Sequence, residues 1–271
     1  MAALPRRRRG SADTLLAQLV STLRDQLDGG RARVVVGLTG APGSGKSTIA
    51  AHLEQMLADA GLLAGSVPMD GFHLSNAVLD ALDRHDRKGA PDTFDVDGFL
   101  SVLDRVRGAA GQGGRAGSAT GRSNTVSGTD TDEDRPRSPG TDAVSGTASD
   151  AVGEPRDVLA PVYRRDLHEP VAAGSLVHGR GVVVTEGNYL ALDSHGWEAV
   201  RERIDVLIML EVPEDRLIGR LIARHKSFGR LSADAAHWVR AVDVPNARLV
   251  AGTAERCDEV WELDSGDDVR A

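Results

Sequence analysis

The strongest constraint on the fold of this chain is a glycine-rich loop between an apolar segment and an amphipathic one. Residues 40–47 read GAPGSGKS and fit the pattern G-x-x-x-x-G-K-[ST] at every fixed position. Residues 33–39 before the loop have the apolar character of a buried strand, and residues 48–57 after it have the spacing of a helix. In that context the glycines let successive backbone N–H groups point at phosphate oxygens beside a helix N-terminus.

A nucleoside triphosphate site is therefore predicted at this loop. Lys46 is expected to reach the β- and γ-phosphates, and Ser47 to hold Mg²⁺. An ordinary glycine-rich turn is the alternative, and the strand and helix on either side argue against it. The predicted nucleotide-binding residues are Gly40, Ala41, Pro42, Gly43, Ser44, Gly45, Lys46, Ser47 and Thr48.

Composition limits the partners of this chain. Its 271 residues carry a formal net charge of −8, whereas a nucleic-acid-binding protein would normally present a basic face. The basic run at residues 6–9 is short and is interpreted as part of a solvated tail. Cys257 is the single cysteine, so neither an intramolecular disulfide nor a C-x-x-C metal site can form. No stretch of about eighteen apolar residues occurs. We expect a cytoplasmic protein without nucleic-acid or membrane partners, and the oligomeric state stays open, a homodimer included.

Apolar and amphipathic segments alternate along the chain. Strands are expected near residues 64–69, 181–185, 205–211 and 259–263, and helices near 15–23, 96–106, 197–203, 215–225 and 233–242. Strands that alternate with helices imply a parallel sheet covered on both faces. The predicted fold class is α/β, a three-layer P-loop NTPase fold with a parallel sheet, helices on both faces and a small helical lid.

The composition changes abruptly between residues 108 and 157. This segment has no Leu, Ile, Met or aromatic residue, so it cannot bury enough apolar surface to offset the entropy of ordering it. The sequence therefore divides into an N-terminal tail and helix (1–30), the first part of an α/β domain (31–107), a disordered low-complexity insertion (108–157) and the second part of the domain with its lid (158–271).

Two carboxylates follow predicted strands and are expected near the glycine-rich loop. Asp70 comes after the strand at 64–69 and Glu186 after the strand at 181–185, and ligands of parallel sheets bind beyond the carboxyl ends of the strands. Glu186 suits a magnesium partner. Asp70 suits a base that takes the proton of an acceptor hydroxyl, although an Asp-Gly pair read alone indicates a turn. The chain has neither the N-K-x-D tetrad of guanine-reading GTPases nor an S-G-G signature.

Further motifs carry a family resemblance. Residues 70–79 (DGFHLSNAVL) and 87–95 (RKGAPDTFD) resemble segments of the P-loop kinase group that contains uridine kinase, phosphoribulokinase and type I bacterial pantothenate kinase. Residues 186–190 (EGNYL) and 243–247 (DVPNA) are more similar to a bacterial branch called nucleoside/nucleotide kinase-like proteins. The resemblance extends over residues 34–250, apart from the insertion.

The resemblance implies an ATP-dependent kinase that transfers the γ-phosphate to a hydroxyl of a small metabolite, with ATP and Mg²⁺ as its cofactors. It implies that Asp70 is the general base and that Asp70, Ser47 and Glu186 organise the metal ion. Lys46 completes the phosphate-binding chemistry.

The resemblance also assigns a lid and an acceptor side. A lid near residues 215–230 would clamp the phosphates through Arg220 and Arg224, which lie four residues apart and so share one helix face. A solvated helix face is the alternative for these arginines. The acceptor-side residues that the motifs would bring to the crevice are His73, Asn76, Lys88, Tyr163, Arg165, Asn188 and Tyr189.

The acceptor itself is not fixed by the sequence. Tyr163 stands in a P-x-Y segment similar to the one that lines the acceptor pocket of related kinases. Arg164 and Arg165 follow it, where uridine kinases have Asp-Phe and pantothenate kinase has a histidine two residues after its tyrosine. A nucleoside, a pantothenate-like compound and a sugar therefore stay open. The two arginines could favour an anionic acceptor, because Arg binds carboxylates and phosphates bidentately.

Two other functions stay open. One is a nucleotide-dependent switch or ATPase that acts through a protein partner, with the insertion as its interaction arm. The other is a degenerate kinase that acts only as a binding module. The acceptor-side motifs argue against the switch, and the complete set of core chemical residues argues against the degenerate kinase.

Overall fold

The computed structural model describes residues 4–108, 155–227, 229 and 231–264. These residues belong to one compact unit, formed by residues 1–110 and 154–271. The insertion predicted at 108–157 lies almost wholly outside the described residues.

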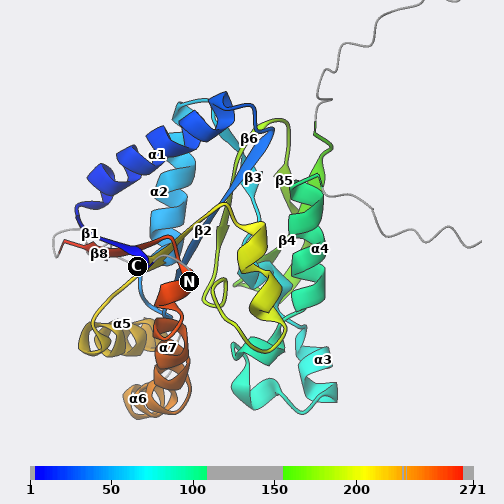
Figure 1. Cartoon of the computed structure of the whole chain (residues 1–271). Coiled ribbons are helices and arrows are strands. Elements are labelled where there is room, and N and C mark those ends of the chain that lie inside the picture. Colours follow the sequence, from blue (N-terminus) through cyan, green and yellow to red (C-terminus); the bar gives the residue numbers. More distant parts are fainter. Residues whose placement is uncertain (1–3, 109–154, 228, 230, 265–271) are drawn as a thin grey trace, which may run out of the picture. The chain divides into compact units, whose positions relative to one another are not determined.

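A six-stranded parallel sheet forms the centre of this unit (Figure 1). Its strand order is β1 (Arg6–Gly10), β8 (Glu259–Leu263), β7 (Val206–Leu210), β2 (Arg33–Gly40), β6 (Gly181–Glu186) and β3 (Leu63–Ser66). Every neighbouring pair runs parallel. β2 is buried at every position, because its Val-rich run has a strand on either side and helices over both faces.

Helices cover the two faces of the sheet. α1 (Ala12–Asp28) and α2 (Lys46–Asp59) pack on the face that carries Val34. α4 (Val96–Val106) packs on the opposite face, with Val35. Successive side chains of a strand point to opposite faces, so one Val-rich strand supplies both cores. The predicted α/β architecture is confirmed.

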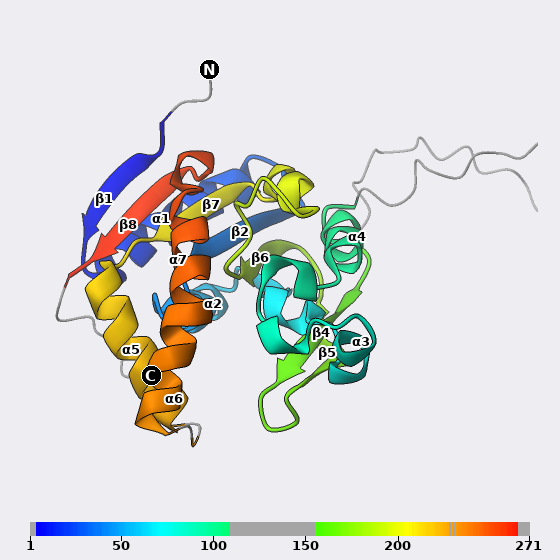
Figure 2. The same cartoon turned by 90° about the horizontal axis from the view of Figure 1, so that it is seen from below.

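A β-hairpin and a short helix that were not predicted from the sequence lie close to each other. β4 (Val158–Arg164) and β5 (Glu169–Val177) form a separate antiparallel two-stranded sheet, and α3 (Asn76–Ala81) lies close to it. Figure 2 shows this hairpin and α3 together on one side of the unit, with α2 between them and helices α5 to α7.

Four consecutive elements make up the lid region: α5 (Glu214–Ser227), α6 (Ser232–Trp238), a π-helical turn (Val239–Asp243) and α7 (Val244–Ala251). Their apolar cluster includes Leu217 and Leu221 and also contains Ala41 of the glycine-rich loop. The lid region therefore packs directly on that loop. The helices predicted at 215–225 and 233–242 are confirmed, the second with the π-helical turn in its last part.

The interpretation of residues 6–9 as a solvated tail is wrong. These residues lie in β1, which pairs in parallel with β8 at the edge of the sheet. Arg7 Nη1 lies 2.6 Å from Glu211 Oε2. Arg8 Nη1 lies 3.2 Å from Glu259 Oε2. Carboxylates of the neighbouring segments thus balance the basic run and let it form an edge strand.

Other boundaries differ less from the prediction. The helix expected at 197–203 is two short 3₁₀ turns, Trp197–Ala199 and Arg201–Arg203. The strand before Asp70 ends at Ser66, and a 3₁₀ turn at Met69–Phe72 carries the aspartate. Further 3₁₀ turns lie at His85–Arg87, Pro91–Thr93 and Ala254–Arg256. None of the described helices combines the length and the apolar character needed to cross a bilayer.

Candidate active site

The glycine-rich loop connects the end of β2 to the start of α2. At Gly40 the backbone has a φ of 151°, and a Cβ atom there would lie 2.6 Å from the carbonyl oxygen of Leu210. Glycine therefore lets the chain leave β2 directly beside β7. Inside the loop, Lys46 Nζ donates to the carbonyl oxygen of Ala41 over 3.1 Å, which folds the side chain back over the loop.

The loop presents hydrogen-bond donors that lack acceptors. Among the described residues, no carbonyl accepts from the backbone N–H groups of Gly45, Lys46 and Ser47, which lie at the start of a helix. The hydroxyl of Ser44 is the one buried side-chain polar atom in the described part of the chain without a hydrogen-bond partner. Buried polar groups are normally paired, so these donors fit a ligand with many acceptor oxygens, as a triphosphate has.

Lys46 is held in a buried, electrostatically mixed environment. Its side chain is among the few buried charged groups of the described residues, with 7% of the residue exposed. Burial lowers the pKa of Lys46, the carboxylates of Glu186 and Asp70 oppose this, and the guanidinium of Arg224 adds to the lowering. An anionic ligand next to the ammonium group would therefore compensate its desolvation.

Oxygen donors gather next to the loop. Ser47 Oγ donates to Glu186 Oε1 over 3.2 Å. Burial raises the pKa of Glu186, the nearby carboxylate of Asp70 raises it further, and Lys46 opposes both. β6 and β3 are neighbours in the parallel sheet, so the carboxyl ends of these two strands bring Glu186 and Asp70 together.

These donors fit Mg²⁺ better than a metal held by protein alone. Within residues that the structure describes, no group of three or more His, Cys, Asp or Glu side chains is arranged to hold a metal ion. Two carboxylates and one hydroxyl suit Mg²⁺, which completes its octahedral shell with water and substrate phosphates.

The turn that carries Asp70 leads into the acceptor side. A Cβ atom at Gly71 would clash with the carbonyl oxygen of Pro161, so glycine lets this turn pack directly against β4. The ring of His73 lies 4.9 Å from the ring of Tyr163, and His73 Nδ1 donates to the Asp70 carbonyl oxygen over 2.9 Å. Burial lowers the pKa of His73, and the carboxylate of Asp70 opposes that shift. An aromatic wall thus begins three residues after the candidate base.

Lys88 connects the other predicted acceptor-side residues. Its Nζ donates to Asn76 Oδ1 over 2.6 Å and to the His168 carbonyl oxygen over 2.9 Å, and it lies 5.4 Å from the Tyr163 ring centroid. The Asn76 backbone N–H donates to both carboxylate oxygens of Glu169, over 3.0 and 3.2 Å. Glu169 was not predicted as a site residue, because no pattern in the sequence indicated the hairpin that brings it to α3. Four predicted acceptor-side residues are therefore grouped: His73, Asn76, Lys88 and Tyr163.

Tyr189 corrects one prediction. It was predicted to face the acceptor, but its side chain is fully buried and its hydroxyl donates to the Gly89 carbonyl oxygen over 2.6 Å. Its ring packs 5.7 Å from that of Trp197, and burial raises the pKa of the phenol. Tyr189 thus supports the loop after Lys88 from the core. Asn188, whose carbonyl oxygen accepts from Thr39 Oγ1 over 3.1 Å, is half-buried and stays a prediction.

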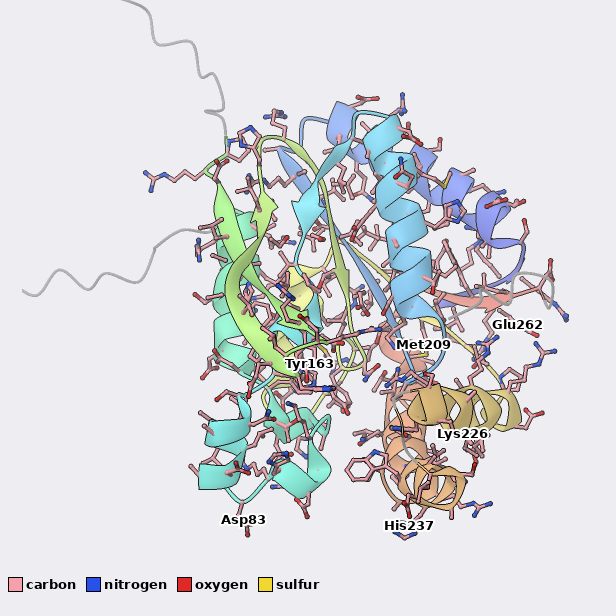
Figure 3. The ribbon with its side chains drawn as sticks, turned by 180° about the vertical axis from the view of Figure 1, so that it is seen from behind. Asp83, Tyr163, Met209, Lys226, His237 and Glu262 are labelled. Carbon is pink, nitrogen blue, oxygen red and sulfur yellow. The ribbon has the colours of Figure 1, made fainter. Side chains whose placement is uncertain are left out.

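The lid helix α5 brings the two predicted arginines toward the loop. Arg220 Nη1 donates to the Gly43 carbonyl oxygen over 3.4 Å. Arg224 is exposed but close enough to Lys46 to affect its pKa. Figure 3 shows Lys226 and Tyr163 on opposite sides of the lower part of the unit, on the lid and on the hairpin. Arg230, expected at the end of the lid, lies outside the described residues.

The two consecutive arginines after Tyr163 differ in their contacts. Arg164 binds Asp166 bidentately, over 2.8 and 2.7 Å, on the exposed side of the hairpin. Arg165 is exposed. Burial raises the pKa of Tyr163 and that of Glu186, and the charge of Arg165 opposes both shifts.

One family model matches the first part of the chain. The family described as "Methylmalonyl Co-A mutase-associated GTPase MeaB" matches residues 3–72. That match covers the first strands and the glycine-rich loop, and it ends before the acceptor-side residues.

Three relatives match over more of the chain. One is a candidate fructose transport system kinase from Silicibacter sp. TM1040, whose crystal structure has 31% identity, covers 91% of this chain and 98% of that chain, and has a TM-score of 0.68. Another is a candidate uridine kinase, C227.14, of Schizosaccharomyces pombe, 27% identical over 222 residues, which are 79% of this chain and 74% of that protein. A third is the ATP-dependent kinase YFH7 of Lachancea thermotolerans, 30% identical over 217 residues, which are 76% of this chain and 57% of that protein.

Proposed function

We propose an activity for this chain from the premise that it belongs to the P-loop kinases, in the group that includes proteins named as uridine and pantothenate kinases. It is an ATP-dependent kinase in general terms. The specific proposal is that it transfers the γ-phosphate of ATP to a hydroxyl group of a small metabolite.

The observation that carries this proposal is the position of Asp70 between two groups of side chains. Its carboxylate acts electrostatically on Lys46 and Glu186 beside the glycine-rich loop. It also acts on His73 and Tyr163 on the acceptor side. A base for phosphoryl transfer needs this location, because it must reach an acceptor hydroxyl that lies in line with the γ-phosphate.

The chain's own groups then have distinct tasks. The loop amides and Lys46 bind the phosphates. Asp70 accepts the proton of the acceptor hydroxyl while the hydroxyl oxygen forms its bond to the γ-phosphorus. The bond from that phosphorus to the bridging oxygen breaks, and ADP leaves with the electron pair. Arg220 and Arg224 stabilise the charge that spreads over the transferred group.

Magnesium belongs to this proposal as a bound partner of the nucleotide. Ser47, Glu186 and Asp70 are the residues that would hold it. When bound, Mg²⁺ neutralises negative charge on the phosphates.

The assignment of the base is tested with Asp70→Asn, which keeps the size of the side chain. We expect turnover to fall by about 10²- to 10⁴-fold while ATP binding is largely kept. Asp83→Asn is the matched control, because Asp83 is exposed in the turn that follows α3. Near-normal turnover of Asp70→Asn would show that Asp70 is not the base.

One observation favours a second function. The MeaB match at residues 3–72 supports a nucleotide-dependent switch that acts through a protein partner. The two functions differ in their response to small alcohols, since a switch would hydrolyse ATP at a rate that no acceptor changes.

A further inference from the structure

We propose that the acceptor of this kinase carries an anionic group, a carboxylate or a phosphate, and that Arg165 binds it. This inference rests on the proposed function and names the class of acceptor. It starts from β4, which carries Tyr163 and ends one residue before Arg165.

The two consecutive arginines after Tyr163 differ in their surroundings. Tyr163 lies on the acceptor side, where its ring is 4.9 Å from that of His73. Arg165 is the first residue of the turn after β4, two residues beyond Tyr163, and its charge acts on the Tyr163 phenol. Arg164, the last residue of β4, is held by Asp166.

Arg165 also lies toward the site of phosphoryl transfer. Its charge acts on Glu186, the carboxylate that accepts from Ser47 at the start of α2. The charge of Arg165 thus acts on one residue of the acceptor side, Tyr163, and on one residue beside the glycine-rich loop, Glu186.

Lys88, a second cation on the acceptor side, already donates hydrogen bonds within the protein. Lys88 Nζ donates to Asn76 Oδ1 and to the His168 carbonyl oxygen, and the carboxylate of Glu169 acts on it. In contrast, the described residues include no carboxylate within ion-pair distance of Arg165. Arg165 is thus the guanidinium on this side whose planar donors remain for a ligand.

The carboxylates around the site also favour a role for Arg165 in binding an anionic acceptor. Asp70, Glu186 and Glu169 place carboxylates along the crevice, and these would repel an anionic acceptor. The guanidinium of Arg165, whose charge acts on Glu186, offsets part of this repulsion and offers a bidentate contact to a carboxylate or phosphate. Neutral alcohols would leave that guanidinium without a partner.

The test compares acceptors in pairs that share a carbon skeleton and differ in charge. The pairs are pantothenol and pantothenate, glucose and gluconate, ribose and its monophosphate, and uridine and its monophosphate. ADP release from Mg·ATP is measured for the wild type, Arg165→Ala, Arg165→Lys and Arg164→Ala, with thermal unfolding to confirm that each variant is folded. The carboxylate and phosphate pairs distinguish the two kinds of anion.

We expect the anionic member of at least one pair to be preferred by the wild type. Arg165→Ala should raise its KM by about 10- to 100-fold with little change in kcat, since the contact is to a part of the acceptor that does not react. Arg165→Lys should recover part of this loss, and Arg164→Ala should match the wild type.

Two outcomes would overturn the inference while leaving the kinase intact: a preference for neutral members, or an anion preference that survives in Arg165→Ala. If no member of any pair raises ADP release, the proposed function fails and this inference fails with it.

Discussion

His225 Nε2 lies 2.7 Å from Asp243 Oδ2, and both side chains are nearly buried, with 13% and 12% of their area exposed. This contact joins α5, which carries Arg220 and Arg224, to the π-helical turn before α7. π-Helical turns are frequent at functional sites. The pair therefore holds α5, which carries the two arginines proposed to bind the phosphates, against the π-helical turn.

His225→Ala should destabilise the protein by about 1–3 kcal/mol, because it leaves a buried carboxylate without its partner. Turnover should fall as well, since Arg224 is the adjacent residue. The matched control is His178→Ala, whose pair with Asp157 is exposed, with 74% and 55% of the side chains accessible. It should change the free energy of unfolding by less than about 1 kcal/mol. Equal effects of the two variants in urea titrations would contradict a special role for the lid pair.

The contact between Ser47 and Glu186 predicts a defect in metal use. Ser47→Ala and Glu186→Gln should each raise the free Mg²⁺ concentration needed for half-maximal turnover by about 10- to 100-fold. The exposed residue Ser21 on α1 provides the control Ser21→Ala, with an unchanged requirement. An unaltered Mg²⁺ dependence in both site variants would exclude these oxygens as metal partners.

Arg33 explains why the long insertion should be dispensable for folding. The guanidinium is buried and donates to the carbonyl oxygens of Val106 (3.4 Å), Arg156 (3.0 Å) and Gly179 (2.9 Å). It therefore holds together the two segments that flank residues 109–154. Replacing those residues with a short Gly/Ser linker should leave the unfolding midpoint and acceptor-dependent ATP turnover unchanged.

Arg33→Ala should instead cost about 1–3 kcal/mol, because it removes three hydrogen bonds, one of them to the buried residue Val106. Arg180→Ala, at an exposed position, should cost little. A deletion variant that unfolds far more readily than the wild type would show that the insertion contributes to the fold. Loss of activity at normal stability would favour the switch function.

Cys257 predicts a pH-dependent reactivity. The thiol is buried, and burial raises its pKa to about 12. Only the thiolate reacts, so roughly one molecule in ten thousand is reactive at pH 8. As long as the pH is below the pKa, each increase of one pH unit raises this thiolate fraction about tenfold. Iodoacetamide should label the folded protein far more slowly than protein in urea, with one adduct per chain. Equal labelling rates would contradict the buried position.

The parts of the fold that were predicted correctly have local causes. The helix at 96–106 has apolar residues at helical spacing, and Asp95 caps it by accepting from the Gly98 N–H over 2.9 Å. The Val-rich β2 and β6 could be recognised as central strands for the same local reason.

The missed elements depend on distant partners. Four consecutive arginines carry no strand pattern, and β1 forms because carboxylates such as Glu211 and Glu259, far along the chain, lie beside it. The β4–β5 hairpin has no turn motif of the usual kind, and His168 at its turn has a positive φ of 53°. Both β1 and the β4–β5 hairpin therefore form because of tertiary contacts, and local strand propensity does not explain them.

The candidate site also contains residues that the sequence could predict and residues that it could not. Lys46, Ser47, Asp70 and Glu186 lie together because each stands at or beyond the carboxyl end of a strand of one parallel sheet, which the sequence could indicate. The sequence could not indicate which way an aromatic ring points. Tyr189 was predicted as an acceptor contact and is a core residue, whereas Glu169 was not predicted and contacts Asn76.

The most direct test of the central claim is mass spectrometry of Mg·ATP reactions with neutral and anionic alcohols. The account predicts that one alcohol gains a single phosphoryl group as ADP forms, and that Lys46→Ala abolishes the product. Tight ATP binding with acceptor-independent hydrolysis, and no phosphorylated alcohol, would contradict it.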